Sequence, residues 1–202
     1  LGTVRALARR GIQAEAVRGA VVDIGMGDTD ISFSWENLFA ANKAIIDADA
    51  DRYFFVPDAV EVTVANAPEM TAHAPVYPNK PERGERLLHF TGKVLLPRAE
   101  VEKGGMLRLK DLFNIRMTGE ATAEYAGESL AEARKEKAPI IQWLPAENAA
   151  PCSLLTPEGM QDGFAEPEVL GYAGKIVQFE RVGFAKIDAV ENGKAVAYHT
   201  HR

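Results

Sequence analysis

The chain has 202 residues, of which 47% are hydrophobic and 26% charged, and its formal net charge is −6. This composition is ordinary for a folded globular protein, and the length allows one large domain or two small ones. No apolar run approaches the roughly 18 to 20 residues that a membrane span needs, and no signal peptide pattern precedes the first helix. Cys152 is the single cysteine, which excludes an intrachain disulfide. A reducing cytoplasm is therefore the expected location.

The first fifty residues predict helices. Helical spacing covers 3–10 and 14–24, and Ser34 caps a third helix that runs to about Ile46 after a Gly-Met-Gly-Asp-Thr-Asp break. The chain starts at Leu1 in helix-like sequence and without a methionine, so we expect a piece of a longer protein. The inner face of the third helix is expected to carry Trp35, Leu38, Phe39, Asn42 and Ile45.

From Arg52 onward the hydrophobic period changes to two, which predicts short strands. Candidate strands are 59–64, 90–96, 107–109, 112–117, 140–144, 153–155, 175–179, 182–187 and 195–198. Glycine and proline punctuate the gaps, and the Asn-Gly pair within 191–194 predicts a hairpin turn. At the end of the segment 120–137, residues 132–137 are expected to form an exposed loop or hairpin tip. The pattern as a whole predicts a mainly β chain with N-terminal α structure, its strands arranged as a barrel or sandwich.

The basic residues are concentrated in one window. Residues 80–116 carry nine lysines and arginines against five acids, so the window is +4 while the remainder is −10. Such a stretch allows local RNA binding in an acidic protein, although a solvated charged face gives the same pattern. No phosphate-binding glycine loop, nucleophile elbow, zinc motif or paired cysteines occur. His199 and His201 suggest a disordered tail more than a metal site, so we expect no catalytic residue and no metal ligand.

Four blocks of sequence resemble one family. They are 77–86 (YPNKPERGER) with the following FTGKV and PRAE, 139–144 (PIIQWL), 163–184 (from GFAEP to KIVQFERVGF) and 1–12 (LGTVRALARRGI). Taken in their order along the chain, they resemble the glutaminyl-tRNA synthetases and the archaeal or eukaryotic glutamyl-tRNA synthetases of class I, with Gln142 in place of a histidine. The segment 34–43 (SWENLFAANK) is similar to the archaeal glutamyl helix. Glutamine–tRNA ligase, or a stand-alone RNA-binding barrel module, remains an alternative.

The resemblance implies a helical connecting domain over 1–50, followed by two antiparallel β-barrels. The proximal barrel would comprise 51–96 and 163–202, and the distal barrel 97–162. The chain would be the C-terminal, anticodon-binding portion of a monomeric glutamate–tRNA ligase that acts on tRNA(Glu) and, in some relatives, on tRNA(Gln). The catalytic domain, with its ATP and Mg²⁺, would lie upstream, so this portion should not aminoacylate alone.

The resemblance also implies RNA-binding residues. Arg52 and Gln178 match the positions that read the central uridine, whose pairing edge suits a glutamine amide and an arginine. Without the resemblance, Arg52 would be expected to pair with Asp51 or Asp58. Arg116 matches a wobble-base position and Arg108 a third-base position, but the neighbouring Thr118 and Leu107 depart from the family pattern. Further residues expected to line the groove are Tyr77, Lys80 and Arg86.

Overall fold

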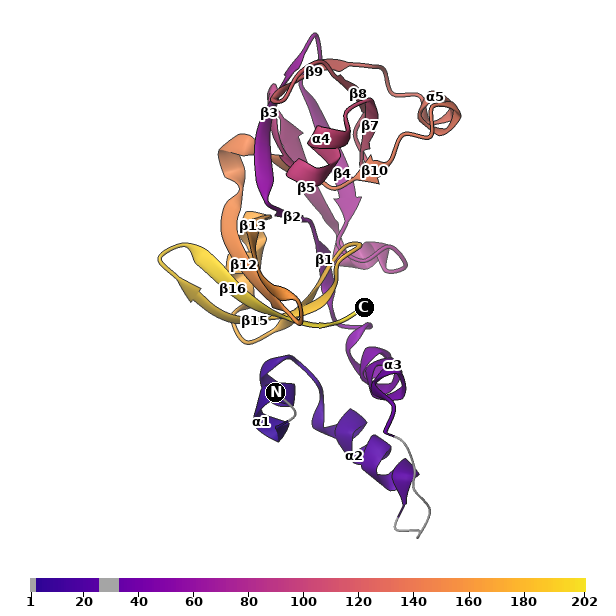
Figure 1. Cartoon of the computed structure of the whole chain (residues 1–202), viewed down its shortest axis with the longest axis vertical. Helices are drawn as coiled ribbons and strands as arrows, with labels where there is room; N and C mark the ends of the chain where they lie inside the picture. The colour runs from indigo at the N-terminus through magenta and orange to yellow at the C-terminus, as the bar shows by residue number, and fades with distance from the viewer. Residues whose placement is uncertain (1–2, 26–32) are drawn as a thin grey trace.

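The computed structural model describes residues 3–25 and 33–202 and arranges them in three parts along one long axis (Figure 1). One end is helical, with α1 (Val4–Arg9), α2 (Ala14–Ile24) and α3 (Trp35–Ile46). Two curled seven-stranded sheets follow, which we call the proximal sheet, next to the helices, and the distal sheet, at the far end. This confirms the predicted mainly β fold with N-terminal helices. Most of the predicted Gly-Asp break before α3 lies outside the described residues.

The helices begin where the sequence predicts. The side chain of Thr3 accepts a hydrogen bond from the Ala6 amide, and that of Ser34 accepts one from the Asn37 amide, both at 3.2 Å. The buried stripe of α3, however, is Leu38, Asn42 and Ile46, at the four-residue spacing of a single helix face. The predicted inner positions of Trp35 and Ile45 are therefore wrong, since both side chains are exposed.

The proximal sheet is built from both ends of the β region. Its strand order is β1 (Asp51–Tyr53), β14 (Ile176–Phe179), β15 (Gly183–Glu191), β16 (Lys194–His201), β12 (Ala150–Thr156), β13 (Gly159–Ala165) and β2 (Phe55–Pro57). The edge strands β1 and β2 are consecutive in the chain and are separated only by Phe54. One continuous segment therefore joins the two edges of this sheet, and the curled sheet becomes barrel-like.

The distal sheet is closed in the same way, by a short segment that joins its two edge strands. Its order is β10 (Ile140–Ile141), β7 (Met106–Leu109), β8 (Asn114–Met117), β9 (Thr122–Tyr125), β3 (Ala59–Ala65), β6 (Lys93–Pro97) and β11 (Leu144–Pro145). Its edges, β10 and β11, are separated only by Gln142 and Trp143. A hairpin of β4 (Met70–Pro75) and β5 (Glu85–Phe90) packs its buried side chains into the core of this sheet. The short helices α4 (Arg98–Lys103) and α5 (Leu130–Lys135), with the 3-10 turns η1 (Pro81–Arg83), η2 (Ala146–Asn148) and η3 (Pro167–Tyr172), connect the strands.

The strand grouping differs from the expected barrels in two ways. Strands β3 and β6, expected in the proximal barrel, hydrogen-bond in the distal sheet, whereas β12 and most of β13, expected in the distal barrel, lie in the proximal sheet. Both sheets are also mixed rather than wholly antiparallel, because β1–β14, β12–β16, β7–β10 and β3–β9 pair in parallel. We propose domain boundaries that follow the sheets, with 51–57 and 150–202 in the proximal barrel.

One local prediction needs correction and another is confirmed. The expected loop or hairpin tip at 132–137 is instead largely helical, because α5 spans Leu130–Lys135 and Ser129 caps it by accepting from the Glu132 amide. The predicted hairpin is present, with Asn192 and Gly193 at φ 50° and 76° between paired Glu191 and Lys194.

The expected C-terminal tail is instead the end of strand β16. His201 is 2% exposed and contacts the rings of Phe39 and Phe184, at centroid distances of 5.3 and 5.4 Å. Its Nε2 lies 2.9 Å from the Asn42 amide nitrogen, and that amide also donates to the Gly11 carbonyl. Asn42 Oδ1 accepts from the Gln13 amide, so Nε2 of His201 accepts and the imidazole is neutral. The buried Asn42 thus joins the helices to the proximal sheet.

Candidate nucleic-acid interface

Arg52 and Gln178 lie side by side on the outer surface of the proximal sheet. They are register partners across the parallel strands β1 and β14. Their neighbours Tyr53, Val177 and Phe179 are buried in the core of that sheet, so strand alternation turns Arg52 and Gln178 outward. Among the described residues, Arg52 Nε and Gln178 Oε1 are buried without a hydrogen-bond partner. An unpaired donor and an unpaired acceptor at adjacent positions suit the polar edge of one ligand.

Arg52 does not form either of the ion pairs that the alternative interpretation expects. Asp51 is paired with Arg83 at 2.5 Å, and Asp58 is paired with Arg98 at 3.1 Å. The carboxylate nearest to Arg52 belongs to Asp47, just beyond the end of α3, at 4.0 Å. That separation is at the limit of an ion pair, and it leaves donors of the guanidinium free for a ligand.

The aromatic ring of Tyr77 packs against the guanidinium of Arg52. The guanidinium carbon of Arg52 lies 4.9 Å from the centre of the Tyr77 ring, and Lys80 Nζ and Arg83 lie 5.1 and 5.7 Å from it. The hydroxyl of Tyr77 donates to Asp47 at 3.2 Å. Tyr77 is almost fully buried. Its ring therefore packs against the Arg52 guanidinium and does not line an open groove as expected.

The proline-rich loop 77–86 clamps the end of the helical part. Lys80 Nζ donates to the Ala48 carbonyl at 2.8 Å, and Arg83 donates to the carbonyls of Ala48 and Asp49 at 2.9 and 3.0 Å. These cations lie where the carbonyl end of α3 concentrates negative potential. Lys80 is therefore committed to the helix–strand junction in this structure, although it was expected to face the RNA.

Arg86 departs most from the expectation. Its side chain is 3% exposed and lies between the two sheets, where it pairs with Glu166 and donates to Glu180 Oε1 at 2.8 Å. Its guanidinium also lies over the Phe54 ring at 4.8 Å. A buried side chain with these partners has no surface for a phosphate or a base. A direct RNA contact is thus replaced by a structural role, and removing one member of such a buried pair costs about 3–5 kcal/mol.

Glu166 completes this buried cluster. Its Oε1 accepts from the Phe54 amide at 2.6 Å and from Arg86. Burial raises the pKa of the Glu166 carboxyl to about 7, although Arg86 and the Phe54 amide act in the opposite direction.

Arg108 and Arg116 share one face of the distal sheet. Arg108 is paired in register with Asn114, and Arg116 follows two positions later on the same strand, so strand alternation puts all three on one side. Arg108 donates to the Glu128 carbonyl at 2.9 Å and to Asn114 Oδ1 at 3.3 Å. Arg116 forms a two-point ion pair with Glu136 at 2.8 and 2.9 Å, and both side chains are nearly half exposed. An exposed pair of this kind is worth about 0–1 kcal/mol, so a phosphate can compete for Arg116.

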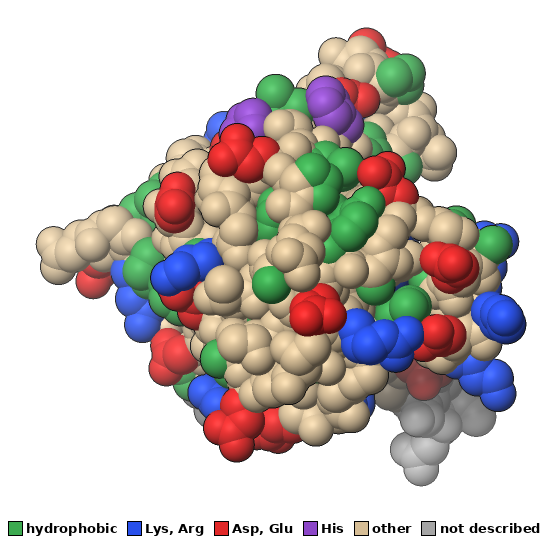
Figure 2. All heavy atoms as spheres, turned by 90° about the horizontal axis from the view of Figure 1, so that it is seen from above, with side chains coloured by type: hydrophobic (Ala, Val, Ile, Leu, Met, Phe, Trp, Pro, Cys, Tyr) green, Lys and Arg blue, Asp and Glu red, His purple; other side chains and the backbone are tan. Residues whose placement is uncertain are grey.

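The predicted basic window is largely neutralised. Seven of its nine cations are paired with carboxylates, and Lys80 and Arg108 donate to backbone carbonyls. Figure 2, which looks onto the distal end, shows basic and acidic side chains interspersed rather than gathered by sign. This window therefore offers a phosphate backbone no broad positive field, and a site for RNA here would need local geometry.

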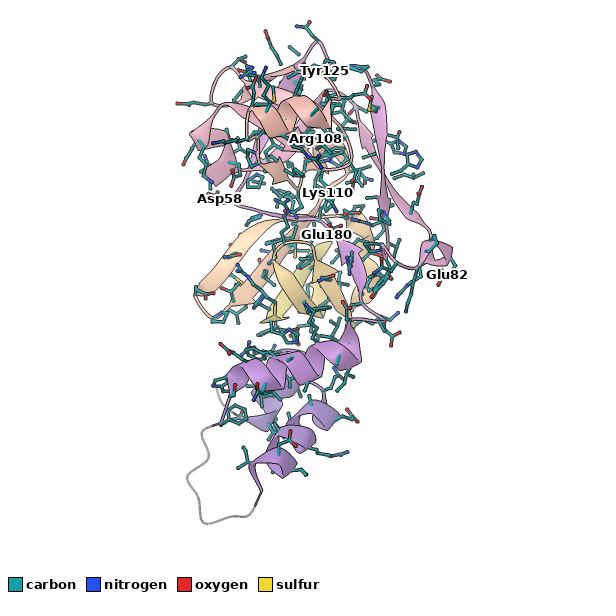
Figure 3. The ribbon with its side chains drawn as sticks, turned by 90° about the vertical axis from the view of Figure 1, so that its right-hand side faces the viewer. Asp58, Glu82, Arg108, Lys110, Tyr125 and Glu180 are labelled. Atoms are coloured by element: carbon teal, nitrogen blue, oxygen red, sulfur yellow. The ribbon has the colours of Figure 1, made fainter. Side chains whose placement is uncertain are left out.

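The base-reading candidates are linked across the two sheets. In Figure 3, Arg108, Lys110 and Glu180 follow one another from the distal to the proximal sheet on a single side of the molecule. Lys110 is paired with Glu180, and the Gln142 amide donates to the Glu180 carbonyl at 2.9 Å. Sequence reasoning missed Lys110 and Glu180. The available signal was their spacing, since each follows a candidate reader, Arg108 or Gln178, by two positions.

The described residues contain no cluster of three or more histidine, cysteine, aspartate or glutamate side chains that could hold a metal ion. Within the same part of the chain, no helix is long and apolar enough to cross a membrane.

Comparison with known proteins agrees with the mainly β, barrel-like fold. Family models described as "tRNA synthetases class I (E and Q), anti-codon binding domain" match residues 50–132 and 140–188. Glutamate–tRNA ligase of Methanocorpusculum labreanum is 78% identical over 202 residues, and that of Methanoculleus marisnigri is 57% identical over 205. The enzyme of Pyrococcus abyssi is 41% identical over 214 residues. Each alignment covers the whole chain but only 36 or 37% of the relative. The chain belongs to the anticodon-binding domain family of the class I glutamyl and glutaminyl tRNA synthetases.

Proposed function

We propose that this chain recognises the anticodon of tRNA(Glu) as part of an ATP-dependent ligase that attaches glutamate to that tRNA. The carrying observation is the in-register pair of Arg52 and Gln178, with Nε and Oε1 buried and unpaired within the described part of the chain. The pairing edge of uracil presents one N–H donor with a carbonyl acceptor on each side of it. Gln178 Oε1 can accept from that N–H, while the guanidinium of Arg52 donates to a flanking carbonyl.

Glutamate is favoured over glutamine as the amino acid. The relatives given above are named glutamate–tRNA ligases, and their alignments extend over the helical residues as well as the barrels. We propose that catalysis, with ATP and Mg²⁺, belongs to a separate domain that corresponds to the part of the relatives outside the alignment. We further propose a cytoplasmic monomer, with tRNA(Gln) as a possible second substrate.

The distal sheet supplies the contacts to the flanking bases. Arg116 is proposed for the wobble base and Arg108 for the third base, because both lie on the same face of β7 and β8. Leu107 is buried and apolar, so it offers no hydrogen bond to the third base. Thr118 donates to Thr122 at 3.1 Å and offers no cation to the wobble base. The central-base pocket is accordingly the primary determinant in this proposal.

Binding of anticodon stem-loop RNA tests the proposal. Fluorescence anisotropy at fixed salt should give a Kd for the tRNA(Glu) loop about 5- to 150-fold lower than for loops whose central uridine is replaced by cytidine or adenosine. The Arg52→Ala variant should lose most of this preference. Arg98→Ala is the matched control, because it removes an exposed arginine paired with Asp58 away from the pocket. Equal affinity of the unmodified chain for all three loops would exclude anticodon reading by this site.

A further inference from the structure

A chain of charges crosses the boundary between the two sheets. Lys110, which follows β7 of the distal sheet, is paired with Glu180, which follows β14 of the proximal sheet. Glu180 also accepts from Arg86 at 2.8 Å, and Arg86 is paired with Glu166. We call these four residues the inter-barrel latch: Arg86, Lys110, Glu166 and Glu180. All four side chains are buried or mostly buried, with exposures of 3%, 26%, 3% and 14%.

Further hydrogen bonds to backbone carbonyls surround the latch. The Gln142 amide donates to the Glu180 carbonyl at 2.9 Å, and the Trp143 indole donates to the Lys110 carbonyl at 3.0 Å. Arg181 donates to the Ile140 carbonyl. Because Gln142 and Trp143 also close the distal sheet, movement of one sheet against the other would strain that closure. The junction is therefore stiff where the two sheets meet.

The position of the latch along the strands is the informative feature. Lys110 lies two residues beyond Arg108, and Glu180 lies two residues beyond Gln178. Phe54, whose amide is held by Glu166, lies two residues beyond Arg52. Each latch contact thus fixes the end of a strand that presents a proposed base-reading side chain. These contacts therefore set the separation between the Arg52–Gln178 pair and Arg108.

We propose that the inter-barrel latch is a positioning device that makes the reading of neighbouring anticodon bases cooperative; this rests on the proposed function. Two pockets held at a fixed separation act as a bivalent receptor, in which capture of one base raises the effective concentration of the next base at its own pocket. Lys110 and Glu180 are positioning residues and need not touch the RNA.

Glu180→Gln is the most informative variant. It keeps the side-chain size but removes the charge that faces both Arg86 and Lys110. The loss of an acidic group should by itself leave RNA binding unchanged or strengthen it. The measurement uses four anticodon stem-loops, with the correct or an incorrect central base combined with the correct or an incorrect third base. In the unmodified chain, the preference for the correct third base should be about tenfold larger when the central base is also correct.

In Glu180→Gln that extra preference should disappear, while the preference measured with an incorrect central base stays the same. Lys110→Met should give the same result as Glu180→Gln, whereas Lys110→Arg, which keeps the positive charge, should retain the cooperativity. Glu61→Gln is the control, since it removes one partner of the exposed Lys93–Glu61 pair within the distal sheet. Thermal melting of each variant checks that it is folded, and Lys110→Met serves if Glu180→Gln is not.

Three results would overturn the positioning role. Equal weakening of all four RNAs by Lys110→Met would indicate a phosphate contact. Loss of third-base preference irrespective of the central base would indicate a direct base contact. Unchanged cooperativity in folded Glu180→Gln and Lys110→Met would show that the latch is structural only. If the unmodified chain distinguishes none of the four RNAs, the proposed function itself fails.

Discussion

Arg52 and Gln178 meet through a parallel strand pairing that joins the beginning and the end of the β region. Within the described residues, each side chain keeps one buried polar atom unpaired, Nε in Arg52 and Oε1 in Gln178. Leaving such an atom unsatisfied costs a protein about 1–3 kcal/mol. Because both atoms are covered in the free chain, a ligand that supplies the missing partners recovers this free energy once the two side chains have moved to expose them.

Gln178→Glu should separate binding from stability. The carboxylate is nearly the same size and can pair with Arg52, so the melting temperature should stay the same or rise. It would also hold Arg52 away from the uracil carbonyl. We expect affinity for the central-uridine loop to fall at least about tenfold, a loss of about 1.4 kcal/mol or more. Anisotropy and thermal melting are the measurements, and undiminished affinity in the folded variant would contradict the pairing scheme.

Periodicity predicted elements well where local chemistry decides them. The Ser34 cap and the Asn-Gly turn at 192–193 act over three or four residues, and the structure contains both. Strand grouping was predicted poorly, because membership of a sheet depends on partners far along the chain. Nothing near β12 indicates that it pairs with β16 rather than with the distal strands.

The site shows the same division. The family resemblance led to Arg52 and Gln178, whose adjacency the register provides. The same resemblance implied that Arg86 and Tyr77 line the groove that faces the RNA. Their burial depends on Glu166, Glu180 and the end of α3, which only the folded chain brings together. The resemblance therefore indicated function, while burial determined which of these residues are free to bind.

Glu136 should act as a competitor for Arg116. Glu136→Ala removes the carboxylate of the exposed pair, so Arg116 becomes available to a phosphate or base. We expect RNA binding to strengthen two- to fivefold, about 0.4–1 kcal/mol. The plot of log K against log salt concentration should become steeper by about one unit, as one added phosphate contact requires. Arg116→Ala should weaken binding and flatten the slope. Titrations at several salt concentrations measure both, and a Glu136→Ala variant with unchanged affinity and slope would show that Arg116 does not contact RNA.

Gly163 tests the closure of the proximal sheet. It pairs with Pro57 across β13 and β2, and an added Cβ would lie 2.2 Å from the Val56 carbonyl oxygen and 2.9 Å from Pro57 Cα. Both obstacles are backbone atoms, so Gly163→Ala must move one strand. We expect a loss of about 1–3 kcal/mol in the free energy of unfolding, or about 2–4 °C in Tm per kcal/mol. Gly171→Ala is the control because its Cβ meets no atom within 4 Å. Equal melting temperatures would contradict the observed pairing.

His201 should make the junction between the helices and the proximal sheet sensitive to acid. Burial lowers the pKa of His201, and the neighbouring His199, Lys43 and Arg10 act in the same direction, while the Arg202 carbonyl opposes them. Burial also lowers the pKa of His199. The folded pKa values thus lie below the unfolded value of about 6.5, so the unfolded chain binds protons first as the pH falls. Stability is fully present above that value and is lost below it.

Protonation of His201 would also oppose the Asn42 amide, which cannot reverse its orientation because Oδ1 accepts from the Gln13 backbone. Thermal melting between pH 8 and 5 should therefore show a falling Tm in the unmodified chain. His201→Gln keeps an acceptor for Asn42 without a titrating group, so its Tm should fall less over the same range. His73→Gln is the matched control, because His73 is exposed and pairs with Glu85 on the β4–β5 hairpin. Parallel pH profiles for the His201→Gln variant and the unmodified chain would show that this histidine does not control the junction.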